Sequence, residues 1–368
     1  MAKPKIIVSG INMVEGGIFT VLDACLHSFN KINFDNDFEI IALVNNKSIF
    51  DYPNISFLEF PKSKKYWFLR FYYEYFYFKQ LSKKLRPDIW LSLHDMTPNV
   101  VCEMQFVYCH NPNMFYKSTI KDWFFDYKMG IFGLFYKYLY QINIKKNNVV
   151  FVQQDWIKSR FENEFGIENV IVSQPFFDFI NEVKSTNLEL DSNKIHFFYP
   201  SFPRTFKNFE LIFEAILLLD KNISDKICVH ITLDKLSENR YLKFLIKKYG
   251  HIAQVNFTGL LSKTQMISFY KAIDCLVFPS KLETWGLPIS EAKFFEKSMF
   301  LANLPYAKET VGCYKKVSFF DIENPQELAV LIADFVCQNI VFDGNISKVN
   351  ETKKLVGWAE LFDFMLKK

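Results

Sequence analysis

Two glutamates eight residues apart are the residues of this chain best suited to bind a polar ligand. Glu283 lies in a polar loop that follows an apolar run, Cys275–Phe278, and Glu291 lies about one turn inside a helix that Pro288 opens. Their positions differ enough that the two carboxylates cannot point at the same atom. Because a carboxylate accepts two hydroxyl hydrogen bonds at once, the pair suits two hydroxyl-bearing groups at the two ends of one ligand.

The bend between these glutamates favours a phosphate. In an open parallel sheet, ligands lie beyond the carboxyl ends of the strands, and the first turn of the following helix presents free N–H groups and the positive end of the helix dipole. A phosphate held there would have a hydroxyl-bearing group on either side, which describes a nucleotide sugar. The alternative is two solvated glutamates, because most glutamates in proteins are exposed.

The residues around the two glutamates carry a family resemblance. The run 256–292 contains, in order, Phe257 and Gly259, Asp274, Pro279-Ser280, Glu283 and Glu291. This pattern of strand ends, a short helix and two glutamates resembles the carboxyl-terminal core of the retaining GT-B glycosyltransferases of family 4. The segment 304–309, Leu-Pro-Tyr-Ala-Lys-Glu, is similar to the loop after the next strand in that family.

The resemblance implies roles for the residues of this bend. Glu291 would bind the ribose hydroxyls of the donor, and Glu283 would act on the donor sugar as a catalytic residue. Backbone amides would bind the phosphate or the sugar, contributed by Thr284, Trp285, Gly286 and Leu287. Family 4 enzymes generally need no metal, so the resemblance implies no metal and no cofactor, only a UDP- or GDP-linked sugar as donor substrate.

A loop with two cations follows the predicted strand Ile195–Tyr199. In the family, a Gly-Arg pair begins this loop and a lysine ends it, and the two cations grip the diphosphate. Lys207 matches the lysine and would be catalytic, because breaking the sugar–phosphate bond leaves negative charge on the departing diphosphate. The Gly-Arg position reads Ser201-Phe202 here, so Arg204 would be a displaced substitute. The alternative is a solvated lysine and arginine on an ordinary loop.

The first half of the chain offers a glycine loop and two histidines. Gly16 and Gly17 end a loop before a helix-like run, and the resemblance gives them the role of a glycine loop that faces the donor; a simple turn is the alternative. The loop is not Gly-x-Gly-x-x-Gly, so a dinucleotide site is not supported. His110 ends a strand-like run and matches a histidine that contacts the transferred sugar in the family. His94, followed by Asp95, is the second candidate, and an ordinary structural histidine is the alternative for both.

Length and pattern predict two α/β domains. A chain of 368 residues exceeds one ordinary core, and strand-like runs alternate with helical segments, which is typical of parallel sheets. We predict an N-terminal, acceptor-side Rossmann-like domain over 1–175 and a C-terminal Rossmann-like domain over 176–350 that binds the nucleotide sugar, with a linker at 176–193. A last helix over 351–368 would pack back on the first domain. The resemblance implies the GT-B fold, two Rossmann-like domains facing across a cleft. The predicted strands span residues 5–9, 38–44, 55–60, 89–93, 104–108, 149–153, 195–199, 227–232, 255–258, 275–278 and 299–302.

The region 62–146 is basic and rich in aromatic residues. It holds fourteen Lys or Arg and six Asp or Glu, interleaved with Phe, Tyr and Trp at helix-compatible spacing, although the net charge of the whole chain is only +4. One interpretation is that part of this surface contacts an anionic bilayer to reach a lipid-linked acceptor. Ordinary packing in a Phe-rich protein is the alternative. We expect no nucleic-acid partner, because the chain has no recognised motif and no strongly basic overall balance.

Compartment and metal content follow from the remaining composition. No run of eighteen or more apolar residues exists, and the amino-terminal residues lack a signal-peptide pattern. We therefore expect a cytoplasmic protein, located at the inner face of the inner membrane if the bilayer contact holds. The seven cysteines are dispersed without a Cys-x-x-Cys pair, so we expect reduced thiols and no metal site.

These observations lead to one functional hypothesis with alternatives. The chain would be a retaining glycosyltransferase of the hexosyltransferase type that moves a sugar from a nucleotide diphosphate to a glycan or a polyprenyl-linked glycan. By resemblance, the biology would be synthesis of bacterial surface polysaccharide such as lipopolysaccharide. A nucleotide-sugar epimerase or a phosphorylase on the same fold is the first alternative, and a non-catalytic glycan-binding scaffold is the second.

Overall fold

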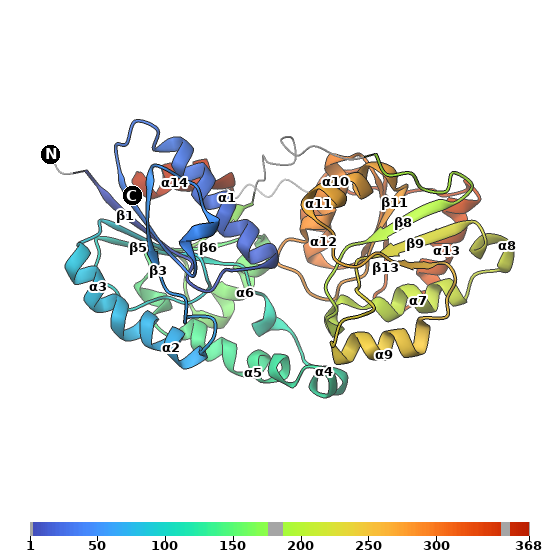
Figure 1. The fold of residues 1–368 in the computed structure, drawn as a ribbon, viewed down its shortest axis with the longest axis horizontal. Helices are drawn as coiled ribbons and strands as arrows, with labels where there is room; N and C mark the ends of the chain where they lie inside the picture. The colour runs from blue at the N-terminus through green and yellow to red at the C-terminus, as the bar shows by residue number, and fades with distance from the viewer. Residues whose placement is uncertain (1–2, 176–186, 347–353, 368) are drawn as a thin grey trace. The chain divides into compact units, whose positions relative to one another are not determined.

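The chain forms two compact units. A computed structural model describes residues 3–175, 187–346 and 354–367. The first unit comprises residues 1–114, 134–177 and 351–368, and the second comprises 115–133 and 178–350 (Figure 1). Residues 115–133, which the sequence analysis includes in the N-terminal domain, thus belong to the second unit. Most of the predicted linker, 176–186, lies outside the described residues.

The first unit contains an eight-stranded parallel sheet. Its strands are β1 (Lys5–Ser9), β2 (Glu39–Val44), β3 (Ile55–Glu59), β4 (Ile89–Ser92), β5 (Met104–Cys109), β6 (Val149–Val152), β7 (Val170–Gln174) and β14 (Leu355–Val356). They lie in the order β14-β7-β6-β5-β4-β1-β2-β3. The chain therefore runs from β1 toward one edge and then crosses to β4 and runs toward the other, so β1 and β4 flank the switch point of the sheet.

Helices cover both faces of this sheet. They are α1 (Gly16–Ile32), α2 (Trp67–Tyr72), η2 (Tyr73–Tyr77), α3 (Phe78–Leu85), α6 (Asp155–Phe165) and α14 (Gly357–Leu366), with short turns η1 (Lys47–Ile49), η3 (Asn113–Phe115) and η4 (Ile144–Lys146). The helix α5 (Tyr127–Gln141) begins in residues of the second unit and ends in residues of the first.

Aromatic contacts fix the two faces of the first sheet. Phe78 of α3 packs on Trp90 of β4, with their ring centroids 5.4 Å apart, and both side chains are fully buried. On the other face, Phe362 of α14 packs edge to face on Phe29 of α1 at 4.7 Å. The pair α1 and α14 thus covers one face, and α2 and α3 cover the other (Figure 1).

The second unit contains a six-stranded parallel sheet. Its strands are β8 (Ile195–Tyr199), β9 (Ile227–Ile231), β10 (Val255–Phe257), β11 (Cys275–Phe278), β12 (Ser298–Ala302) and β13 (Val317–Phe320). Their order is β10-β9-β8-β11-β12-β13, so the switch point lies between β8 and β11. Ligands bind beyond the carboxyl ends of the strands at such a point, which directs attention to the loops after β8 and β11.

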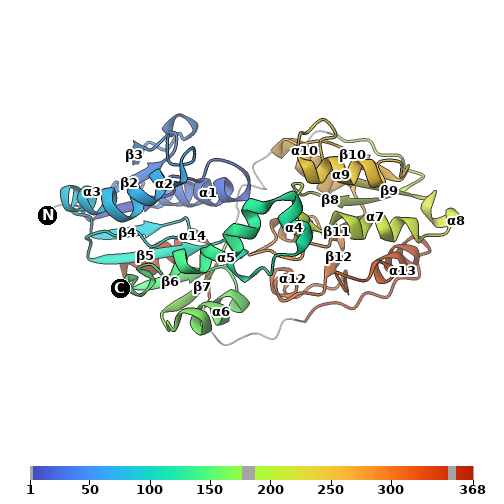
Figure 2. The same ribbon diagram turned by 90° about the horizontal axis from the view of Figure 1, so that it is seen from below.

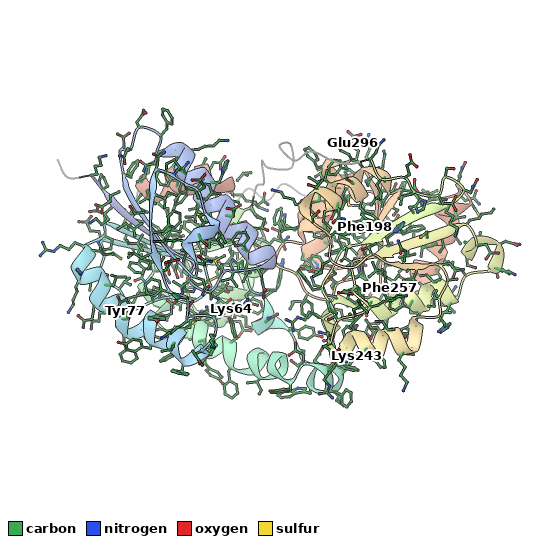
Figure 3. All side chains as sticks on the ribbon, viewed as in Figure 1. Lys64, Tyr77, Phe198, Lys243, Phe257 and Glu296 are labelled. Carbon is green, nitrogen blue, oxygen red and sulfur yellow. The ribbon has the colours of Figure 1, made fainter. Side chains whose placement is uncertain are left out.

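Helices sandwich this second sheet as well (Figure 2). They are α4 (Ile120–Phe125), η6 (Thr205–Lys207), α7 (Phe209–Leu217), α8 (Lys221–Ser224), α9 (Arg240–Tyr249), α10 (Lys263–Ala272), α11 (Leu287–Phe294), α12 (Pro305–Val311) and α13 (Pro325–Val336). Along β8, the side chains alternate between faces. Phe197 contacts Phe335 of α13. Phe198, which is labelled in Figure 3, stacks on Phe269 of α10 at 5.1 Å.

Among the described residues, none of the helices combines the length and the apolar character that crossing a membrane requires.

Candidate active site

An ion pair joins the two loops at the switch point of the second sheet. Lys207 ends η6 after β8, and its Nζ pairs with Oε1 of Glu283 in the loop after β11. Both side chains are half-buried, 16% and 15% exposed. A backbone hydrogen bond of 2.8 Å from the N–H of Lys281 to the carbonyl of Phe206 connects the same two loops. Two sequence-predicted catalytic residues are therefore in direct contact.

Three aromatic side chains position Lys207. The Tyr199 hydroxyl donates a hydrogen bond of 2.6 Å to the Lys207 carbonyl, and Tyr199 itself is fully buried at the end of β8. The ammonium lies 5.3 Å from the ring centroid of Phe206 and 5.9 Å from that of Phe278, within the range of cation–π attraction. The lysine is held as a localised positive charge beside one carboxylate.

Side-chain hydrogen bonds hold the loop after β11 at two of its carbonyl groups. Tyr306 donates a 2.7 Å hydrogen bond to the Ser280 carbonyl, and the Thr310 hydroxyl donates to the Trp285 carbonyl. The loop ends at Gly286, the N-cap of α11, with φ of +77°, a backbone conformation that side-chain-bearing residues rarely adopt. The predicted donor-binding residues 284–287 thus form the sharp turn into the amino-terminal end of α11.

Glu291 lies one turn into α11 and has a separate partner. Its Oε2 accepts a 2.6 Å hydrogen bond from the hydroxyl of Tyr270, a buried residue of α10. Partial burial removes water from the Glu291 carboxylate and so raises its pKa. The Tyr270 hydrogen bond and the charge of Lys263 oppose that rise. Because Tyr270 donates to Oε2, Oε1 is the oxygen best available for a further hydroxyl.

Arg204 has a different partner from the one predicted for a diphosphate-binding cation. Its guanidinium pairs with Asp126, which follows α4, and its side chain is 53% exposed. In the same segment, the Thr205 hydroxyl donates to Asp122. These two contacts connect the segment around α4 to the loop after β8 within the second unit, and Arg204 forms one of them.

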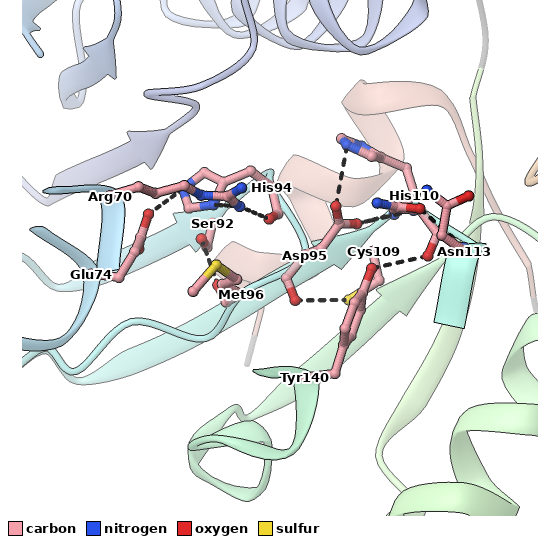
Figure 4. A network of polar contacts seen from close by, with 11 residues as sticks. Arg70, Glu74, Ser92, His94, Asp95, Met96, Cys109, His110, Asn113 and Tyr140 are labelled. Carbon is pink, nitrogen blue, oxygen red and sulfur yellow. Dashed lines mark hydrogen bonds and ion pairs between the residues drawn. The ribbon is translucent and has the colours of Figure 1, made fainter. Parts of the chain in front are cut away.

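His110 lies in a buried polar network of the first unit (Figure 4). It follows the end of β5, and Asp95, with φ of +71°, accepts hydrogen bonds from the backbone N–H groups of His110 (2.7 Å) and Asn111 (3.1 Å). The His110 Nε2 lies 3.8 Å from Asp95 Oδ2, and its Nδ1 has no hydrogen-bond partner among the described residues. Asp95 therefore fixes the backbone at His110, and its carboxylate lies beside the ring.

His94, the second candidate, is enclosed by the same network. Its Nε2 lies 3.2 Å from the Ser9 hydroxyl across the β1–β4 switch point and 3.0 Å from Glu74 Oε1. Arg70 donates a 2.9 Å hydrogen bond to the His94 carbonyl. Burial lowers the pKa of His94 well below its ordinary value, so the ring is neutral at pH 7. Burial raises the pKa of Glu74 to about 8, against the opposing charge of Arg70.

The glycine loop opens α1. Gly16 is the first residue of this helix and has φ of +66°, so a glycine is required there for conformational reasons. The preceding Glu15 forms a 2.7 Å ion pair with Lys64, while Gly17 follows within the helix. The predicted contact of Gly16 and Gly17 with a donor stays a prediction.

Sequence reasoning did not single out the tyrosines that position this site. Tyr199, Tyr270 and Tyr306 each donate to a residue or loop of the candidate site. Tyr199 and Tyr270 read as ordinary apolar positions of a strand and a helix, and Tyr306 lies in the family-like segment 304–309 without a role of its own. Their hydroxyls become informative only once the neighbouring elements are assembled.

Solved structures of similar fold cover nearly the whole chain. Sucrose-phosphate synthase from Thermosynechococcus elongatus aligns with a TM-score of 0.68 at 12% identity, over 92% of this chain and 90% of that chain. The lipopolysaccharide outer core galactosyltransferase WaaB aligns with 0.61 at 14% identity, over 92% of each chain. Anabaena Alr3699/HepE, solved with UDP-glucose, aligns with 0.60 at 15% identity, over 89% and 88%. The predicted fold class is confirmed: the chain has two Rossmann-like units with parallel sheets, the fold of its GT-B neighbours.

A family comparison agrees with the fold. Residues 180–341 match the family described as glycosyl transferases group 1, and this range contains Lys207, Glu283 and Glu291. A search of curated proteins finds no match to the chain. The family match and the fold together support a glycosyltransferase.

The buried Glu74 predicts a measurable pH dependence of stability. Its folded pKa of about 8 exceeds the ordinary 4.5, so between about pH 5 and pH 8 the unfolded chain releases this proton while the folded unit keeps it. The free energy of unfolding should therefore fall as pH rises, by up to about 1.4 kcal/mol per pH unit. Glu74→Gln cannot release that proton, so its stability relative to the parent should increase from pH 5 to pH 8. Urea unfolding of both proteins at several pH values measures this difference, and curves that stay parallel would contradict the assignment.

Proposed function

We propose that this protein is a retaining glycosyltransferase that moves a sugar from a nucleotide diphosphate donor, UDP- or GDP-linked, to a hydroxyl of a glycan or polyprenyl-linked glycan. One observation carries the proposal. The loops after β8 and β11, at the switch point of a sheet in the range that matches the group 1 family, present Lys207 and Glu283 to each other beside the amino-terminal end of α11. A sugar diphosphate has negative charge for the basic group and the helix amino terminus, and hydroxyls for the acidic group.

Lys207 would stabilise the leaving group. Cleavage of the sugar–phosphate bond transfers an electron pair to the diphosphate, and a fixed cation lowers the energy of that charge most when it is already oriented. The ammonium of Lys207 is oriented by Glu283 and by the rings of Phe206 and Phe278. A donor entering the site would give the ammonium a second anionic partner, the diphosphate, while Glu283 turns to hydroxyls of the sugar.

Glu291 would bind the ribose. Its Oε2 is engaged by Tyr270, which leaves Oε1 for hydroxyl donors of the nucleoside. The turn 284–287 would bind the phosphate or the sugar through backbone N–H groups near Gly286. Arg204 would reach the diphosphate only by leaving Asp126, so Lys207 is the principal cation of this proposal.

The neighbouring structures support the substrate classes. HepE was solved in complex with UDP and with UDP-glucose, and WaaB is a galactosyltransferase of the lipopolysaccharide outer core. By analogy of fold, we propose a nucleotide sugar as donor, a surface glycan as acceptor and substitution on the same face of the sugar, with the departing phosphate helping to deprotonate the acceptor. We propose that no metal takes part in transfer. The roles of His110, Gly16 and Gly17 toward the donor stay predictions.

We also propose that the first unit contacts an anionic bilayer at the inner face of the inner membrane. Part of the aromatic content of residues 62–146 packs inside, as Phe78 does, but Trp67, Phe68 and Phe76 of α2 and η2 are 45%, 66% and 59% exposed. Exposed lysines flank them, at 62, 64, 65, 79, 83 and 84. Exposed aromatic rings beside lysines suit the boundary between acyl chains and anionic headgroups.

Substitution of Lys207 tests the transferase proposal. Lys207→Ala should lower the rate of sugar transfer roughly a hundredfold or more, because the leaving diphosphate loses its preorganised cation. Lys243→Ala is the matched control, since Lys243 also pairs with a glutamate but lies exposed on α9. The measurement is product analysis with UDP- and GDP-linked sugars and a lipid-linked glycan acceptor. Transfer by Lys207→Ala at the parental rate would refute the assigned role, and a free isomerised sugar nucleotide or consumption of inorganic phosphate would refute the reaction type.

Vesicle sedimentation tests the membrane contact. The parent should bind vesicles that contain phosphatidylglycerol and not vesicles of phosphatidylcholine alone. The double variant Phe68→Ser with Phe76→Ser should bind the anionic vesicles at least about tenfold more weakly, because each buried ring contributes apolar area. Phe34→Ser is the control, since Phe34 is 81% exposed in the same unit but outside residues 62–146. Equal binding of the double variant and the parent would contradict this proposal.

A further inference from the structure

Two histidines and a cysteine converge on one face of the second sheet, away from the loops that carry Lys207 and Glu283. His196 is the second residue of β8, and Cys228 and His230 are the second and fourth residues of β9. His196 pairs in register with Cys228, and residues two apart in a strand point to the same face. The ligand atoms of the three side chains all lie within 4.8 Å of one another. Parallel pairing thus assembles the cluster from the amino-terminal part of β8 and from two positions along β9.

Hydrogen bonds orient both rings toward a common point. The His196 Nε2 lies 2.9 Å from the Asp191 carbonyl, which can only accept, so this nitrogen carries the proton in the neutral ring. The His196 Nδ1 is then unprotonated and carries a lone pair, and it lies 3.0 Å from His230 Nε2. Both rings are at least 95% buried, so each nitrogen needs a partner.

The outer partner of His230 can also be an acceptor. The His230 Nδ1 lies 3.0 Å from the side-chain amide of Asn256, and Asn256 is exposed. The oxygen and nitrogen of such an amide exchange places by a half-turn. With the oxygen toward the ring, His230 Nδ1 carries the proton and Nε2 becomes a second lone pair. Both histidines then hold their outer N–H on an oxygen, the arrangement that orients metal-ligating imidazoles in proteins.

The donor set selects the class of metal. Tetrahedral zinc with bonds of about 2.0–2.1 Å to nitrogen separates two ligating nitrogens by about 3.3 Å, which is close to the 3.0 Å between His196 Nδ1 and His230 Nε2. Two imidazoles and one thiolate favour borderline-soft Zn²⁺ over oxygen-preferring Mg²⁺ or Ca²⁺.

We propose that His196, Cys228 and His230 bind one Zn²⁺ ion that fastens β8 to β9, with solvent as the fourth ligand beside the half-buried Cys228. Binding would displace the proton from the thiol, so the Cys228 sulfur binds as thiolate and the proton passes to solvent. The site is structural, and it does not depend on the proposed transferase activity. It departs from the sequence-based expectation of no metal, because the three residues become neighbours only through the register of β8 and β9.

Metal titration of the full chain tests this site. The chain is stripped with a chelator, dialysed and titrated with Co²⁺ as a spectroscopic probe. The parent should show a thiolate-to-cobalt absorption band that saturates at one ion per chain and disappears when Zn²⁺ is added. Zn²⁺ should also raise the midpoint of thermal unfolding.

Matched variants separate this cluster from other thiols and imidazoles. Cys228→Ser should lose the thiolate band, and His230→Gln should bind roughly tenfold more weakly or worse. The controls are Cys337→Ser and His251→Gln, since both residues are exposed and lie outside the cluster; both variants should titrate as the parent does. The proposal is overturned if the parent shows no saturable band, or if Cys228→Ser retains it. Should Cys228→Ser fail to fold, unchanged Co²⁺ affinity in folded His230→Gln overturns it equally.

Discussion

The ion pair between Lys207 and Glu283 depends on the order of strands in the second sheet. The strands β8 and β11 are neighbours, but after each of them the chain continues toward a different edge of the sheet. After β8 the chain proceeds to β9 and β10, and after β11 it proceeds to β12 and β13, so no helix connects β8 directly to β11. Their two loops are free to meet beyond the carboxyl ends of the strands. Opposite charges on these loops attract, and the Lys281–Phe206 backbone hydrogen bond aligns them. The proposed chemistry depends on this contact between Lys207 and Glu283. Because the two side chains are already held in place before a donor binds, the lysine is oriented in advance for the diphosphate.

The first unit uses its own switch point differently. At the β1–β4 boundary, Ser9 and His94 meet in a buried network with Arg70 and Glu74. Buried charges cost much free energy unless they are paired or neutralised. Here burial raises the pKa of Glu74, which favours its protonated form, and lowers the pKa of His94, which favours its deprotonated form, so both groups reduce that cost by becoming neutral. The stability of this network thus depends on the protonation states of Glu74 and His94 as well as on its hydrogen bonds. The network also holds the loop that contains Asp95, whose carboxylate accepts the backbone N–H of His110.

The sequence carried much of the fold and part of the site. An apolar run that ends at Pro279 and a helix that Pro288 opens predicted the strand, loop and helix that present Glu283 and Glu291, because proline marks such boundaries locally. Local pattern says nothing about contacts between distant segments, so it gave neither the Tyr270 hydroxyl on Glu291 nor the pairing of Arg204 with Asp126. The strands β7, β13 and β14 were missed. The cluster of His196, Cys228 and His230 could not be predicted, because inter-strand register is a property of the assembled sheet.

The ion pair and the proposed zinc site of the second unit share strand β8 but lie at different places along it. Lys207 and Glu283 follow the carboxyl ends of β8 and β11, whereas His196 lies near the amino end of β8. A rigid strand between them would keep the donor-binding loops in place. The most direct test of the central claim is a crystal structure of the chain with bound UDP or GDP. The account predicts the diphosphate within hydrogen-bonding distance of Lys207 Nζ and the ribose hydroxyls on Glu291. A nucleotide bound with both of these side chains turned away from it would contradict the account.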